Sequence, residues 1–128
     1  MKKIAILGST GSIGVSALDV VSKNPGQLEV VAMAAGRNIE RLSDQVRRFR
    51  PELVSVIDED HARRLKERLG PADTTTVLWG EEGCRCIAAA AAADLVLSAI
   101  VGAAGLIPTL EAIDAGKDVA LEIGRAHV

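Results

Sequence analysis

The sequence predicts an α/β fold in which a doubly wound parallel sheet carries helices on both faces. Short apolar runs alternate with stretches of helical periodicity along all 128 residues, and turn-forming residues separate them. Hydrophobic residues make up 48% of the chain but aromatic residues only 2%, so the core must consist mainly of Ala, Val, Ile and Leu. These residues are typical of parallel strands that are buried on both faces. The length suits a single domain.

The strands are predicted at the apolar runs, which cover residues 3–7, 28–34, 53–57, 75–78, 95–100 and 118–121. A helical pattern joins each pair of successive strands, and we expect these crossovers to be right-handed. A ligand should then lie at the carboxyl ends of the strands, near the point where the strand order reverses.

The helices are predicted between the strands, at residues 12–23, 39–50, 60–69, 81–93 and 106–115. In the second helix, Leu42, Val46 and Phe49 recur at helical spacing and form one apolar face. The alanine-rich run 88–93 is interpreted as a tightly packed helix face rather than as a disordered tract. Acidic pairs such as 59–60 fall at helix N-termini, where carboxylates interact favourably with the helix dipole.

A glycine-rich turn, GSTGSIG at residues 8–14, lies between the first strand and the first helix. A helix N-terminus exposes unpaired N–H groups, and glycines let a pyrophosphate approach the backbone closely. A strand before the turn and a helix after it are the context that a dinucleotide-binding motif requires. Gly11 and Gly14 keep the usual last interval of that motif, whereas Gly8 lies one residue earlier than usual. The alternative is a tight turn that binds nothing.

The end of the second strand indicates which dinucleotide is bound. NAD-binding proteins place Asp or Glu there to bind the ribose 2′-hydroxyl, but this strand is followed by Gly36, Arg37 and Asn38. Arg37 can bind a 2′-phosphate through a forked, charge-assisted contact, and Asn38 can add an amide donor. The pattern favours NADP. In the alternative interpretation, Arg37 is a solvated surface residue and Asn38 caps the next helix, a role that Asn38 can combine with cofactor binding.

Composition argues against several other classes of protein. A net charge of −2 and the scarcity of aromatic residues argue against a nucleic-acid partner. The longest apolar stretch, 87–93, is far shorter than the ~20 residues of a membrane span, so no membrane partner is expected. Cys84 and Cys86 lack a second pair of ligands for zinc and are interpreted as reduced thiols of a cytoplasmic protein. His61, in a polar setting at a helix start, is expected to be exposed rather than catalytic.

Four segments of the chain resemble the N-terminal domain of the 1-deoxy-D-xylulose-5-phosphate reductoisomerase family, which is Rossmann-like. They are residues 6–14, residues 19–21 with 24–25, residues 35–38, and residues 99–106 with 108–109. The resemblance runs from residue 1 to about residue 121. In that family the domain binds NADPH, often with Lys in place of Arg37. The resemblance implies seven cofactor contacts: Thr10, Gly11, Ser12, Ile13, Gly36, Arg37 and Asn38.

The resemblance also implies an activity for the family's full-length enzyme. That enzyme rearranges the carbon skeleton of its sugar phosphate substrate, 1-deoxy-D-xylulose 5-phosphate, and then reduces the resulting aldehyde with NADPH. The product is 2-C-methyl-D-erythritol 4-phosphate, in non-mevalonate isoprenoid biosynthesis. A divalent metal, Mg²⁺ or Mn²⁺, acts as a Lewis acid. The family is typically homodimeric. No catalytic residue and no metal ligand of the family maps onto this chain.

The resemblance fails at residues 122–128, where EIGRAHV replaces the family's Ala-Asn-Lys-Glu continuation. We expect this tail to be non-native, the catalytic and C-terminal domains to be absent, and the chain to bind cofactor without catalysing. Two alternatives remain open. One is the cofactor domain of another NADP oxidoreductase, such as a semialdehyde dehydrogenase-like enzyme, and the other is a non-catalytic nucleotide-sensing module. The gene sequence downstream of Leu121 would distinguish them.

Overall fold

The computed structural model describes residues 2–90, 92–98 and 118–121. Across these residues, parallel strands form one six-stranded sheet in the order β4-β3-β2-β1-β5-β6. The strands are β1 (Lys2–Leu7), β2 (Leu28–Ala34), β3 (Leu53–Val56), β4 (Thr76–Trp79), β5 (Leu95–Ser98) and β6 (Asp118–Leu121). The helices are α1 (Ser12–Ser22), α2 (Ile39–Phe49), α3 (Glu59–Leu69) and α4 (Gly80–Ala88). The Rossmann-like fold class is confirmed.

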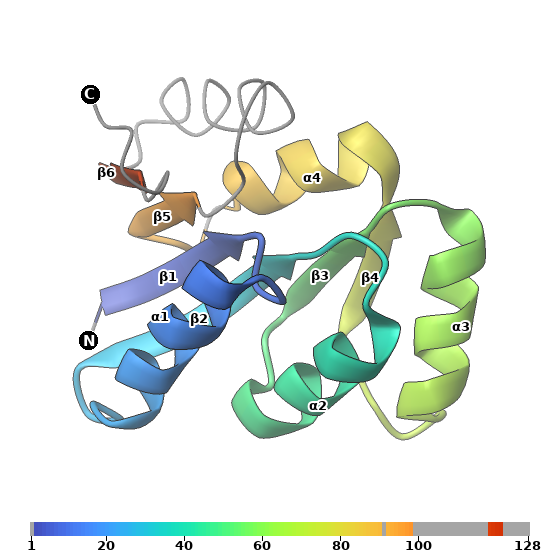
Figure 1. The fold of residues 1–128 in the computed structure, drawn as a ribbon, viewed down its shortest axis with the longest axis horizontal. Helices are drawn as coiled ribbons and strands as arrows, with labels where there is room; N and C mark the ends of the chain where they lie inside the picture. Colours follow the sequence, from blue (N-terminus) through green and yellow to red (C-terminus); the bar gives the residue numbers. More distant parts are fainter. Residues whose placement is uncertain (1, 91, 99–117, 122–128) are drawn as a thin grey trace.

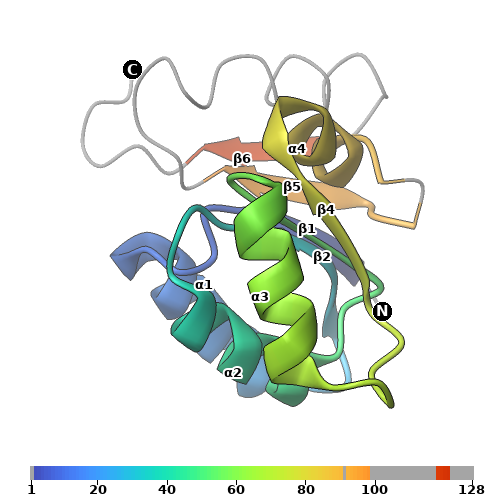
Figure 2. The same cartoon turned by 90° about the vertical axis from the view of Figure 1, so that its right-hand side faces the viewer.

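The helices cover both faces of the sheet, as Figures 1 and 2 show. The chain moves outward from β1 to β4 and then returns to β5, on the other side of β1. Crossovers of one hand therefore place α1, α2 and α3 on one face and α4 on the opposite face. The strand order reverses between β1 and β5, so the crevice at the carboxyl ends of these two strands is where this fold binds ligands.

Two buried clusters, one on each face, form the core. Successive residues of a strand point to opposite faces, so Ile4 and Ile6 join the cluster under α1–α3, while Ala5 and Leu7 join the cluster under α4. The buried hydrophobic side chains of the described residues are aliphatic or Met. The expectation of a core made mainly of Ala, Val, Ile and Leu is confirmed, with Met33 in addition and with Phe49 partly buried against it.

A β-bulge interrupts the pairing of β1 with β2. Ile4 pairs with Val30 and Ala5 with Ala32, which leaves Val31 as an extra residue. Val31 and Ala32 consequently both belong to the cluster under α4. Beyond the bulge the register is regular, and the last residue of β1, Leu7, pairs with the last residue of β2, Ala34.

The prediction that the fourth helix extends to residue 93 is wrong, because α4 ends at Ala88. Tight turns follow it: the N–H of Ala90 donates to the carbonyl of Ile87 (3.2 Å), and that of Ala93 donates to the carbonyl of Ala90 (3.0 Å). These turns bring Asp94 to the start of β1, where its N–H donates to the Lys3 carbonyl (2.7 Å). The pairing of Asp94 with Lys3 thus overrides the intrinsic helix propensity of the alanine-rich run.

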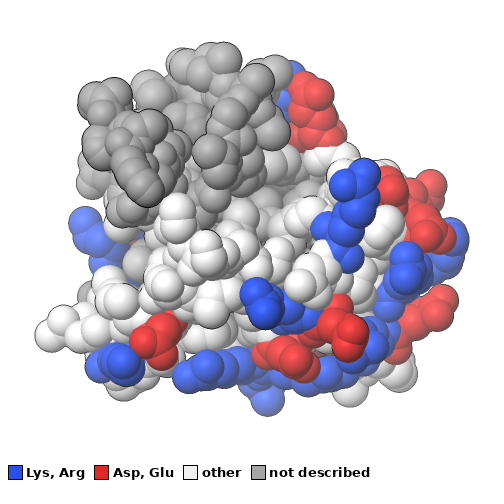
Figure 3. Space-filling model, viewed as in Figure 1, with Lys and Arg blue, Asp and Glu red and all other residues white. Residues whose placement is uncertain are grey.

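The predicted limits of the other described elements agree with the structure to within one residue. The predicted helix at 106–115 and the end of the fifth strand at 99–100 lie outside the described residues. Among the described residues, no helix has both the length and the apolar character that crossing a bilayer requires. Figure 3 shows acidic and basic side chains intermixed along the surface over α1–α3, so this face carries no extended patch of one sign.

Candidate functional site

The loop between β1 and α1 is fixed at the carboxyl end of the sheet. Gly8 begins it with a φ of 88°, in the left-handed region that favours glycine. The N–H groups of Gly8 and Ser9 both donate to the carbonyl of Ala34, at 2.7 and 3.0 Å. The loop is thereby attached to the tip of β2 and lies next to the point where the strand order reverses.

The N-terminus of α1 lacks the side-chain acceptors that the next two helices have. Its N-cap residue is Gly11, and no acidic residue occurs in its first turn. By contrast, Asn38 caps α2 by accepting from the N–H of Arg41 (3.0 Å), and Asp58 caps α3 by accepting from the N–H of His61 (2.9 Å). The first turns of α2, α3 and α4 also contain acidic residues. The positive end of the α1 dipole is therefore available to an anion.

The glycines around this loop fall into two groups. A Cβ at Gly14 would lie 2.2 Å from the carbonyl oxygen of Gly8, so the fold itself requires glycine there. A Cβ at Gly11 would meet nothing closer than 3.7 Å, and a Cβ at Gly36 nothing within 4 Å. Neither of these two residues has a positive φ. The fold does not need glycine at 11 and 36, whereas a ligand approaching the backbone does.

A second candidate position for an anion follows β2. The side chains of Arg37 and Asn38 line an open cavity of about 570 Å³ together with Arg64 and Arg68 of α3. The capping role that the sequence predicts for Asn38 is confirmed. Glu40 and Glu67 also line the cavity, but its three arginines outnumber them and leave an excess of positive charge that suits a phosphate group.

Asp58, which follows β3, is close enough to Arg37 to interact with its charge. Its carboxylate accepts hydrogen bonds from the backbone N–H of His61 and from the His61 ring, and these bonds lower the pKa of the carboxyl group. The charges of His61 and Arg37 lower this pKa further. His61 is half-buried, with Nδ1 2.7 Å from Asp58 Oδ1, so the expectation that it is exposed is wrong. The His61 ring contacts the Asp58 carboxylate, which is the group that caps α3.

A third, mainly apolar cavity of about 340 Å³ lies between these two positions and α4. Its lining includes Gly8, Gly36, Ser55, Ile57 and Cys84. Burial raises the pKa of the Cys84 thiol, and the neighbouring Glu81 carboxylate, which also lines the cavity, raises it further. Sequence reasoning missed the cavity, because its lining comes from separate segments whose apolar residues also fit a simple core.

The structure brings the predicted cofactor residues to one edge of the sheet. Residues 10–13 form the start of α1, and residues 36–38 lead into α2 from the neighbouring strand β2. Arg41 Nη1 donates to the carbonyl of Thr10 (3.0 Å) and links the two segments. Among the described residues, no three His, Cys, Asp or Glu side chains gather as a metal site would require.

Comparison with known proteins identifies the family. The family model described as 1-deoxy-D-xylulose 5-phosphate reductoisomerase matches residues 4–122. The enzyme of that name from Chlorobium phaeovibrioides is 53% identical over 121 residues, which are 94% of this chain and 32% of the relative. The one from Geotalea uraniireducens is 54% identical over 124 residues, 94% of this chain and 31% of the relative. This chain therefore spans about a third of the length of these relatives.

Solved structures agree with this result. A DOX-P reductoisomerase in complex with magnesium has a TM-score of 0.90 and 35% identity, and the match covers 96% of this chain and 31% of that one. The Zymomonas mobilis reductoisomerase in complex with NADPH has a TM-score of 0.88 and 35% identity, over 95% of this chain and 32% of that one. The chain belongs to the 1-deoxy-D-xylulose 5-phosphate reductoisomerase family.

Proposed function

We propose that this chain is the NADPH-binding part of a 1-deoxy-D-xylulose 5-phosphate reductoisomerase. The observation that carries the proposal is the uncapped N-terminus of α1, with an open glycine at Gly11, beside the arginine-lined cavity at Arg37. Two anion positions at the ends of adjacent parallel strands fit the two phosphate-bearing parts of NADPH. A relative of the same fold has been solved with NADPH.

In this proposal each part of the cofactor has its own position. The pyrophosphate binds at Thr10, Gly11, Ser12 and Ile13, at the positive end of α1. The donors are backbone N–H groups of this segment other than that of Gly11, which donates to the Gly8 carbonyl (3.3 Å). The 2′-phosphate binds between Gly36, Arg37 and Asn38, where Arg37 supplies the charge. The adenine ring occupies the third cavity, whose lining is mainly apolar apart from Glu81 and therefore suits a flat aromatic ring.

The activity of the whole enzyme is part of the same proposal. Bound NADPH supplies a hydride, and the residues described above bind and orient it. One solved relative holds NADPH, fosmidomycin and magnesium together. The described residues offer no ligand cluster for magnesium, and we assign the metal and the sugar phosphate substrate to parts of the family's enzyme beyond them. We also propose a cytoplasmic homodimer, a cofactor domain that covers residues 1–121, and a tail at 122–128 that does not belong to it.

A semialdehyde dehydrogenase-like enzyme is less well supported. The family model and the relatives that match this chain are reductoisomerases. A dehydrogenase of that kind carries its nucleophilic cysteine in a later domain, whereas Cys84 and Cys86 lie in α4, before β5.

The proposal is tested by the substitution Arg37→Asp. It removes the cation that would bind the 2′-phosphate and places a carboxylate there, so NADPH affinity should fall much more than NADH affinity. Calorimetric titration of the 128-residue chain with each cofactor measures both. Arg48→Asp is the matched control, because it makes the same change of charge on α2 at a side chain that lies over the Phe49 ring, 5.2 Å from its centroid. Equal losses for NADPH and NADH in the Arg37 variant would contradict the assignment.

A further inference from the structure

The glycine loop is held from one side by helix α2. Gln45 is buried in the second turn of that helix, and its Nε2 donates to the carbonyl of Ser9 (2.9 Å). The hydroxyl of Ser9, which is also buried, donates to Gln45 Oε1 (2.9 Å). The amide of Gln45 therefore both donates to Ser9 and accepts from it, although the two residues lie 36 positions apart in the sequence.

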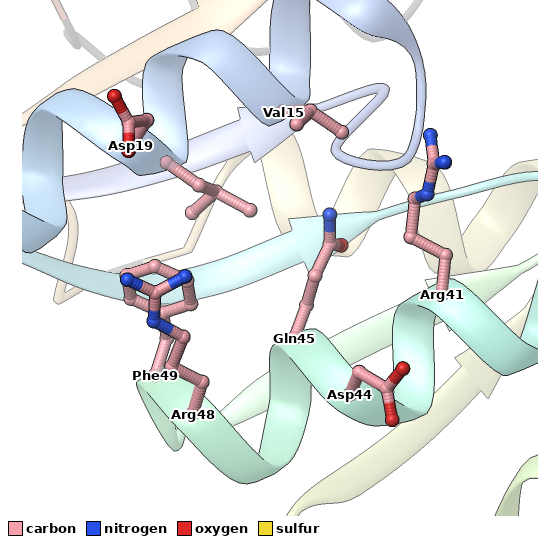
Figure 4. Close-up of a pocket in the computed structure, with 8 residues that line it drawn as sticks. Val15, Asp19, Arg41, Asp44, Gln45, Arg48 and Phe49 are labelled. Atoms are coloured by element: carbon pink, nitrogen blue, oxygen red, sulfur yellow. The ribbon is translucent and has the colours of Figure 1, made fainter.

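A second side chain of the same helix acts on the next residue of the loop. Arg41 lies one turn before Gln45, on the same side of α2, and donates to the carbonyl of Thr10. Figure 4 shows both side chains extending from α2 towards the loop between β1 and α1. Two consecutive carbonyl groups of the loop are therefore fixed by α2.

We infer that Gln45 is a positioning residue that holds the pyrophosphate-binding loop in its binding-competent shape, with Arg41 as a second point of attachment. The inference rests on the proposed function. A peptide group is planar and trans, so the N–H of Thr10 points away from the Ser9 carbonyl that Gln45 holds. Among the described residues no backbone acceptor is found for that N–H. By holding the Ser9 carbonyl, Gln45 thus orients the N–H of Thr10 towards the side of the loop that faces away from α2.

Burial makes this arrangement rigid. A buried amide that loses its partner retains the cost of desolvation, so alternative loop conformations that break the Ser9–Gln45 pair are disfavoured. A loop that is already in its bound shape loses less entropy when the pyrophosphate binds. Gln45 therefore affects affinity for the pyrophosphate without touching it.

The test compares two ligands, NADPH and adenosine 2′-phosphate, which lacks the pyrophosphate. In the 128-residue chain, Gln45→Leu should weaken NADPH binding about tenfold, the change that loss of roughly one hydrogen bond's free energy produces. Affinity for adenosine 2′-phosphate should stay unchanged. Ser9→Ala, which leaves the bond from Gln45 Nε2 to the Ser9 carbonyl, should show a smaller selective loss and serves as the test if the leucine variant does not fold.

Val46→Ala is the matched control, because Val46 is a buried neighbour on α2 that packs in the core under α1–α3. It should lower stability and leave both affinities unchanged. If Gln45→Leu and Ser9→Ala leave NADPH affinity unchanged, or lower both affinities equally, the positioning role is wrong. If the unsubstituted chain binds neither ligand, the proposed function itself is wrong.

Discussion

Single glycines around the β1–α1 loop serve two different purposes. Gly14 packs against the backbone of Gly8 and Ser9, and Gly8 adopts a positive φ. Gly11 satisfies neither condition, because its φ is not positive and a Cβ there would make only an ordinary 3.7 Å contact with the Gly8 carbonyl oxygen. A motif that looks uniform in the sequence therefore separates into glycines that the fold requires, Gly8 and Gly14, and a glycine that it does not, Gly11.

This division predicts opposite outcomes for two alanine substitutions. Gly14→Ala forces a Cβ to within 2.2 Å of a carbonyl oxygen, so the loop must move, and stability should fall by about 1–3 kcal/mol or more. Gly11→Ala should leave the urea midpoint nearly unchanged but weaken NADPH binding. Urea unfolding and cofactor titration of the two variants measure both effects. A Gly11→Ala variant that binds NADPH normally would show that no ligand approaches this residue.

At the scale of whole elements, α4 packs tightly on the strands beneath it. A Cβ at Gly83 would lie 2.5 Å from Ser55 Oγ on β3 and 3.0 Å from Leu78 Cβ on β4. Ser55 Oγ is buried and has no hydrogen-bond partner among the described residues. Glycine at position 83 thus sets how closely α4 approaches the sheet, and with it one wall of the apolar cavity.

Gly83→Ala should therefore destabilise the chain, by about 1–3 kcal/mol for an overpacked contact. Ser55→Ala removes the nearest atom, so the double variant Gly83→Ala/Ser55→Ala should regain part of the loss. Denaturant unfolding of the single and double variants measures this coupling. Strictly additive losses would show that Ser55 does not limit the approach of α4.

Element limits were predictable where strong local signals mark them. Helical periodicity is interrupted by Gly26 after α1, by Pro51 after α2 and by Gly70 after α3. The predicted ends of these three helices agree with the structure to within one residue. The end of α4 was not predictable, because alanine favours helix throughout 88–93 and only the pairing of Asp94 with Lys3 ends it. Gln45 was missed for a similar reason, since a polar residue on a helix predicts exposure unless its distant partner, Ser9, is known.

For the molecule as a whole, cofactor binding should be linked to folding. A ligand that binds only the folded chain stabilises it by about 2.7 kcal/mol at a free concentration of 100 times its Kd. NADPH should therefore raise the melting temperature more than NADH at equal concentration, because only NADPH engages Arg37. Thermal unfolding monitored by circular dichroism measures the shift. An identical shift with both cofactors would mean that the 2′-phosphate contributes nothing.

The carbonyl oxygen of Ala34 accepts hydrogen bonds from both Gly8 and Ser9, and the residues that follow it lead directly to Arg37. The separation between the two proposed anion positions is thus set largely by main-chain geometry at the tip of β2. A dinucleotide analogue with a longer or shorter link between its ribose and its pyrophosphate could occupy one position but not both. We therefore expect the backbone at the end of β2 to determine which ligand lengths fit both proposed positions.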